Sequence, residues 1–116
     1  MYEFLSTAIT AHARWKDELK SAIDHGQLPD LTAVRADDRC DLGKWIYNEG
    51  KNLQDLNEYQ NLKLQHAQFH HVAANVIEMI ANGDKKNAKT EIESGAFAAA
   101  TVKVINAISK LRRKIA

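Results

Sequence analysis

Apolar side chains recur at every third or fourth position in three long stretches of this sequence, a spacing typical of amphipathic α-helices. The stretches run from about residue 2 to 25, 59 to 82 and 85 to 114. Val, Ile and aromatic residues nowhere alternate for long with polar ones, as they would in half-buried strands. One proline and five glycines also leave few turn residues. The sequence therefore predicts an all-α fold.

A short fourth helix is predicted between the first two long ones, over Arg39 to Asn48. Asp37 or Asp38 is suited to cap its start, and Gly50 to close it. Residues 27–36 are predicted to form a loop, with room for one helical turn after Asp30, and residues 51–58 a loop or short turn. Three long helices and one short one predict an antiparallel four-helix bundle. Its other helix ends and breaks are expected at Gly26, Gly83 and Ser94-Gly95.

Size and charge limit what such a bundle does. A chain of 116 residues is expected to form one domain, residues 1–116. A net charge of +1 does not favour binding to nucleic acid or to an anionic membrane. No apolar run is long enough to span a membrane, and no signal peptide is visible, so a cytoplasmic location is expected. A single cysteine excludes an internal disulfide.

Three of the five histidines are predicted to point into the core. His66 and His70 are four residues apart, so their rings leave the same face of one helix, and that face is the apolar one. His12 lies in the apolar stripe of the first helix. Each ring alone is well explained as a core histidine bonded to a carbonyl. Burying three together without partners is costly, and a metal ion removes that cost by taking their lone pairs.

Cys40 completes a set of candidate metal ligands. It is expected in the first turn of the short helix, where backbone dipoles favour a thiolate, and Gly43 one turn later leaves space beside it. A lone cysteine is more often a small buried apolar residue. Three imidazoles and one thiolate nevertheless form a tetrahedral set of borderline and soft ligands, which suits zinc.

These residues resemble a known family. His12-Ala13-Arg14-Trp15, Cys40-Asp41-Leu42-Gly43-Lys44-Trp45 and His66-Ala67-Gln68-Phe69-His70 match the H-x-x-W, C-x-L-G-x-W and H-x-x-x-H pattern of the chemoreceptor zinc-binding (CZB) domain. The gaps match as well, with 24 residues between Trp15 and Cys40 and 20 between Trp45 and His66. The resemblance implies one zinc ion held by His12, Cys40, His66 and His70, with both tryptophans packing around the site.

The resemblance also implies a function. Such domains are non-enzymatic cytoplasmic sensors, typically homodimers, attached to chemoreceptors or diguanylate cyclases, and they respond to zinc or to hypochlorous acid at the zinc-bound cysteine. This sequence carries neither output segment, so we expect a stand-alone member or an excised domain. Two alternatives remain: a metal-dependent bundle of hemerythrin-like or hydrolytic type, and a metal-free interaction bundle.

Several nearby polar residues have simpler explanations. His71 is turned by about 100° from His70 around the helix, so we expect it to face solvent. Asp37, Asp38 and Asp41 flank Cys40 and are suited either to capping and solvation or to accepting the free ring N–H of a ligating histidine.

Overall fold

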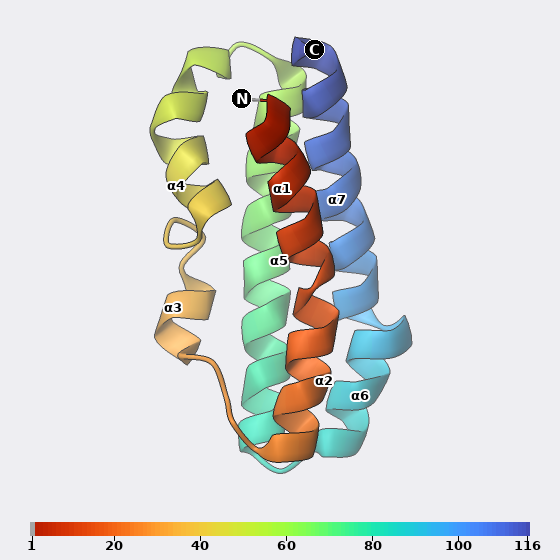
Figure 1. Cartoon of the computed structure of the whole chain (residues 1–116). Coiled ribbons are helices and arrows are strands. Elements are labelled where there is room, and N and C mark those ends of the chain that lie inside the picture. Colours follow the sequence, from red (N-terminus) through yellow and green to blue (C-terminus); the bar gives the residue numbers. More distant parts are fainter. Residues whose placement is uncertain (1) are drawn as a thin grey trace.

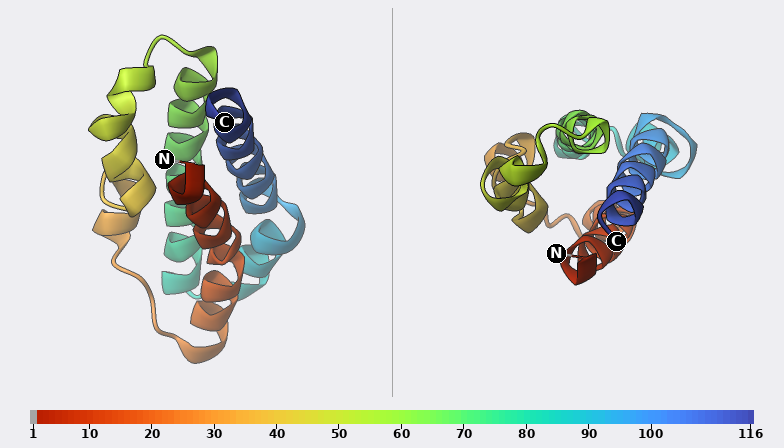
Figure 2. Two further views of the ribbon diagram at one scale, coloured as in Figure 1. Left: turned by 45° about the horizontal axis from the view of Figure 1, so that its top comes forward. Right: turned by 90° about the horizontal axis from the view of Figure 1, so that it is seen from above.

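Residues 2–116 are described by the computed structural model, and they fold into an all-α bundle (Figure 1). The helices form four antiparallel columns: α1 followed by α2, α3 followed by α4, then α5, and finally α6 followed by α7 (Figures 1 and 2). This confirms the predicted fold class. The bounds are α1 Tyr2–Ala13, α2 Trp15–His25, α3 Leu31–Arg35, α4 Asp41–Tyr47, the 3₁₀ helix η1 Glu49–Leu53, α5 Asn57–Ala81, α6 Lys85–Ser94 and α7 Ala96–Ile115.

Two of the four columns are long helices with one local interruption. The first is interrupted only at Arg14, which keeps helical dihedral angles and whose carbonyl still accepts from Glu18 N–H. The last breaks at Gly95, as predicted, and the Glu91 carboxylate accepts from the Ala96 N–H to start α7. Gly26 and Gly83 end α2 and α5 as predicted, both with positive φ angles that suit glycine.

The core lies where α5, α7 and α1 pack together, so the long helices supply most of the buried apolar surface. The predicted apolar stripes are the faces that they bury. Fully buried side chains of these helices include Leu5, Leu62, Phe69, Phe97, Val104, Ile108 and Leu111.

The column formed by α3 and α4 is short (Figure 2), with α3 packed against α5 and α4 in contact with α1. Asp30 caps α3 by accepting from the Thr32 N–H, which confirms the helical turn expected there. Val34 is buried, and Arg35 forms an ion pair with Glu78 of α5. The 4-residue loop and turn from Ala36 to Arg39 then leads directly to Cys40.

The start of the short helix was predicted wrongly. Neither Asp37 nor Asp38 caps it: α4 begins at Asp41, and the Cys40 sulfur itself accepts from the Gly43 N–H at 3.3 Å. Asp37 is used elsewhere, because its carboxylate accepts a hydrogen bond of 2.6 Å from the Tyr47 hydroxyl. The helix also ends earlier than expected, and Gly50 lies inside η1 rather than closing α4.

Gly43 allows the segment before Cys40 to fold back onto α4. A β-carbon placed on Gly43 would lie 1.9 Å from the Asp37 carbonyl oxygen and 2.8 Å from its carbonyl carbon. Both are backbone atoms, which cannot turn away as the end of a flexible side chain can. The space expected beside Cys40 is therefore filled by the Asp37 backbone.

We predict that Gly43→Ala destabilises the protein. Displacing the Asp37 backbone should lower the free energy of unfolding by about 1–3 kcal/mol, despite a gain of about 1 kcal/mol in helix propensity. Lys44→Ala is the matched control, because Lys44 is exposed in the same helix, and it should change stability by about 0.5 kcal/mol or less. Urea denaturation measures both variants, and equal midpoints for them would contradict the predicted clash.

Candidate metal centre

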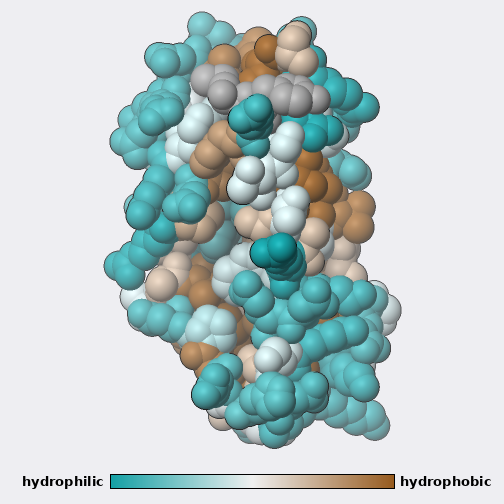
Figure 3. Space-filling model, viewed as in Figure 1, coloured by the Kyte–Doolittle hydropathy of each residue, from teal (hydrophilic) through white to brown (hydrophobic). Residues whose placement is uncertain are grey.

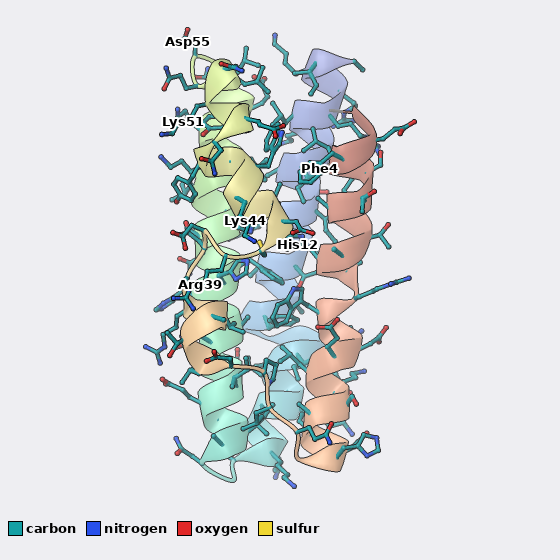
Figure 4. The ribbon with its side chains drawn as sticks, turned by 60° about the vertical axis from the view of Figure 1, so that its left-hand side comes forward. Phe4, His12, Arg39, Lys44, Lys51 and Asp55 are labelled. Atoms are coloured by element: carbon teal, nitrogen blue, oxygen red, sulfur yellow. The ribbon has the colours of Figure 1, made fainter. Side chains whose placement is uncertain are left out.

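Four side chains from three columns of the bundle converge at one point. His12 lies near the end of α1, Cys40 precedes α4, and His66 and His70 lie one turn apart on α5. Figure 4 shows His12 between α1 and the start of α4. All three histidines are at least 97% buried, and Cys40 is partly exposed. The helix spacing of His66 and His70 and the apolar stripe around His12 explain why the rings point inward.

The ligand-type atoms of these residues lie close together. The Cys40 sulfur is 3.1 Å from His66 Nε2 and 3.4 Å from His70 Nε2, and the two nitrogens are 3.0 Å apart. With His12 included, the four atoms lie within 4.8 Å of one another. For comparison, zinc–nitrogen and zinc–sulfur bonds in a tetrahedral site place neighbouring ligand atoms about 3.3–3.6 Å apart. The cluster has the size and the donor set of a four-ligand zinc site.

Backbone carbonyls orient two of the rings. His12 Nδ1 is 2.8 Å from the Ala8 carbonyl, and His70 Nδ1 is 2.9 Å from the Val34 carbonyl. A carbonyl only accepts, so each Nδ1 carries the hydrogen and each Nε2 presents a lone pair to the cluster. Such an outward hydrogen bond is the usual support of a metal-binding histidine.

These lone pairs need a positively charged partner. His12 Nε2 is buried and has no hydrogen-bond partner among the described residues. His70 Nε2 faces both His66 Nε2 and the sulfur, and the Nδ1 of His66 is also without a partner in the described part of the chain. Buried polar atoms left unpaired are costly. A metal cation would satisfy the Nε2 atoms and the sulfur at once, so these residues are suited to bind a zinc ion.

Burial keeps the three imidazoles neutral. Removal from water lowers the pKa of His66 to about 2 and lowers the pKa values of His12 and His70 as well, because a buried imidazolium loses its hydration. Their lone pairs are therefore available at neutral pH. Acid favours the unfolded chain, which takes up protons at these histidines below its own pKa of about 6.5.

The backbone dipoles at the start of α4 were predicted to favour a Cys40 thiolate, but the pKa of the thiol is raised. Burial raises its pKa above the ordinary value, and the N–H groups of Gly43 and Leu42 only partly oppose that effect. The nearby Asp41 carboxylate raises the pKa further. Burial and the Asp41 charge therefore disfavour a thiolate at the start of this helix, and coordination to a cation would remove the proton.

Aromatic side chains surround the cluster. The ring of Trp15 lies 6.2 Å from that of His70, and Phe69 lies 5.2 Å from His12. Trp45 is buried and packs on Phe4, with ring centroids 5.8 Å apart. Trp15 therefore packs beside the cluster, as expected, whereas the ring contact of Trp45 is with Phe4.

The hydrogen-bond partners of the histidines were predicted less well. The acceptors are the carbonyls of Ala8 and Val34, whereas Asp37 accepts from Tyr47. Backbone acceptors leave no mark in the sequence, so no motif could have identified them. Tyr59, whose hydroxyl donates to the Ile46 carbonyl, was also missed, and it ties α4 to α5. His71 is exposed, as predicted.

The comparison with known families gives an independent result. The model of the chemoreceptor zinc-binding domain, CZB, matches residues 12–77, which is more than half of the chain. The chain belongs to the CZB family. All four clustered residues lie within the matched segment, so the zinc that this family binds has a suitable donor set in this CZB domain.

Two other comparisons, with curated proteins and with solved structures, gave no match to this CZB domain. Over residues 2–116, no helix combines the length and apolar character needed to cross a membrane.

Proposed function

We propose that residues 1–116 form one sensory domain, without enzymatic activity, in which His12, Cys40, His66 and His70 bind a single zinc ion. The observation that carries the proposal is the convergence of three imidazole nitrogens and one sulfur in a buried cluster. The donor set favours zinc because imidazole and thiolate are its preferred ligands in closed sites.

The same donor set argues against a catalytic metal. Four protein ligands close a tetrahedral site, whereas a hydrolytic zinc keeps a position for water. Di-iron bundles use bridging carboxylates, and the cluster formed within residues 2–116 contains none. A metal-free interaction bundle is disfavoured by the lone pairs that would then remain buried and unpaired.

Zinc would connect the short column to the rest of the bundle. Cys40 directly precedes α4, whereas the three histidines belong to α1 and α5. α4 is otherwise held by the Tyr59 hydrogen bond to Ile46 and by burial of Leu42, Trp45 and Ile46, whereas Cys40 itself is only partly buried. Loss of the bond to Cys40 would therefore loosen residues 39–47 first and leave the long helices in place.

Cys40 is also the residue at which an oxidant would act. Bound zinc holds the sulfur as a thiolate, which is the nucleophilic form. The sulfur attacks the chlorine of hypochlorous acid, so an S–Cl bond forms, the O–Cl bond breaks and hydroxide leaves. Water then replaces chloride and loses a proton, which gives a sulfenic acid; sulfur is oxidised by two electrons and chlorine is reduced.

The signal would pass to a cytoplasmic partner. Zinc loss or Cys40 oxidation would shift α4, and a dimer surface or an attached chemotaxis or cyclic-di-GMP output module would register the shift. In this scheme a filled, tight site reports oxidants, and a weaker site reports zinc itself.

We predict that the zinc ligands can be separated from neighbouring histidines by single substitutions. His66→Ala or His70→Ala should reduce zinc from about one ion per chain to less than half, because each removes one of four ligands. Both should lower the melting temperature and keep a helical circular dichroism spectrum, since the apolar core is intact. His71→Ala, on the exposed face of α5, is the matched control and should keep its zinc. Wild-type zinc content in either ligand variant would show the assignment to be wrong.

We predict that one equivalent of hypochlorous acid adds oxygen to Cys40 and alters the structure around residues 39–47. Peroxide should react more slowly, because it is the weaker electrophile and a metal-bound sulfur is less nucleophilic than a free thiolate. Cys40→Ser should abolish the response, since a hydroxyl is a poor zinc ligand and is not oxidised. Mass spectrometry and circular dichroism measure both effects. An unmodified Cys40, or an equal structural change in Cys40→Ser, would leave zinc level as the signal.

The domain is also proposed to form a homodimer through the face shared by α1 and α7. Val102 is 59% exposed there, and it lines a surface cavity of about 220 Å³ together with Ala13, Ala98, Thr101 and the charged residues Lys16 and Glu93. Figure 3 shows apolar atoms gathered over α7 on this side. Solvent-exposed apolar surface of this kind favours a protein partner.

Sedimentation should therefore give a dimer at micromolar concentration, and Val102→Lys should shift it toward monomer. Leu64→Lys is the matched control, because Leu64 is a similarly exposed apolar residue on α5. A monomeric wild type, or an equal shift in both variants, would contradict an interface on the face of α1 and α7.

A further inference from the structure

A cavity of about 210 Å³ between α1 and α4 reaches the four clustered ligand residues from outside. Two of the four clustered residues, His12 and Cys40, form part of its wall. Cys40 is partly exposed, whereas the histidines are buried. The cavity therefore gives a small molecule a way to the sulfur that does not require the bundle to open.

The sequence of α1 explains why this space exists. Phe4, Ala8 and Ala11 of α1 and Trp15 at the start of α2 follow one another at spacings of three and four, so they share one face of this column, and all four line the cavity. The two alanines stand between the two aromatic residues in the sequence, and they leave space that larger side chains would fill. Figure 4 shows Phe4 and His12 on the side of α1 that faces α4.

The charge on the cavity lining is negative. Among the described residues that line the cavity, Asp41 is the one ionised side chain, and neither lysine nor arginine is present. Asp41 adjoins Cys40 and its charge acts on the sulfur. The remaining lining is mainly apolar, which favours an uncharged molecule. The Asp41 carboxylate repels an anion, against the residual positive charge that a zinc ion held by one thiolate and three neutral imidazoles would carry.

We propose that this cavity is the route by which small uncharged electrophiles reach Cys40, and that Asp41 makes it selective against anions. The inference rests on the proposed function, since it names the class of reagent that the sensory cysteine admits: neutral hypochlorous acid rather than the hypochlorite anion. The volume of the cavity equals that of about seven water molecules in the liquid, so the cavity admits a molecule of a few atoms.

The test compares two alkylating reagents of similar size on the zinc-loaded protein. Iodoacetamide is uncharged and iodoacetate is an anion; in both reactions sulfur forms a bond to carbon and iodide leaves. Cys40 is the only cysteine, so mass spectrometry reports its rate directly. We expect the ratio of iodoacetamide to iodoacetate rates to be about tenfold higher in the folded protein than in urea, a difference of about 1.4 kcal/mol in activation free energy.

Single substitutions separate the effect of the Asp41 charge from the effect of access through the cavity. Asp41→Asn should bring the rate ratio several-fold closer to the value in urea, and using the ratio cancels any change in the reactivity of the sulfur itself. Ala11→Phe should slow both reagents several-fold by narrowing the cavity. Thr10→Phe is the matched control, because Thr10 is the preceding exposed residue of α1 and does not line the cavity. It should leave both rates unchanged.

The proposed route is wrong if the rate ratio is the same in folded and unfolded protein, or if Thr10→Phe slows alkylation as much as Ala11→Phe. Zinc content is measured on every sample. A protein that contains no zinc but keeps the high rate ratio would support the route while contradicting the proposed function. A protein that binds zinc through Cys40 but lacks the raised ratio would contradict the route alone.

Discussion

Three buried imidazoles and one partly exposed thiol meet at a single point, and the packing around that point is the central feature of the bundle. At that point His12 Nε2 has no hydrogen-bond partner among the described residues, and His66 Nε2, His70 Nε2 and the Cys40 sulfur face one another. A divalent cation would satisfy these atoms together, and the family to which the chain belongs binds zinc. The bundle can then be understood as two helical columns, α1 and α5, that present histidines to one place and a short column that brings the sulfur.

Backbone groups hold this arrangement at least as much as side chains do. The carbonyls of Ala8 and Val34 orient two rings, and the Asp37 carbonyl packs where Gly43 lacks a side chain. The turn before Cys40 is thereby tied to α4, and the Tyr47 hydroxyl reinforces it through Asp37. The sulfur is thus placed by several weak contacts rather than by a long helix, which suits a residue proposed to move when its bond to the metal is lost.

Sequence periodicity predicted the long helices and the inward histidines, because both follow from the 3.6-residue turn. It could not predict where α4 begins. Asp37 and Asp38 have the stronger intrinsic preference for capping, but Asp37 is used by Tyr47, which lies ten residues away. The raised pKa of the Cys40 thiol was missed for a related reason, since burial outweighs the local backbone dipoles. Tertiary contacts decided both features, and no local pattern carries them.

X-ray absorption at the zinc edge of the wild-type protein identifies the atoms that bind the metal. We expect a first shell of three nitrogens at about 2.0–2.1 Å and one sulfur at about 2.3 Å. Cys40→Ser should remove the sulfur from that shell. A wild-type spectrum without a zinc–sulfur distance, or with oxygen ligands in place of the imidazole nitrogens, would contradict the proposed three-histidine, one-cysteine site.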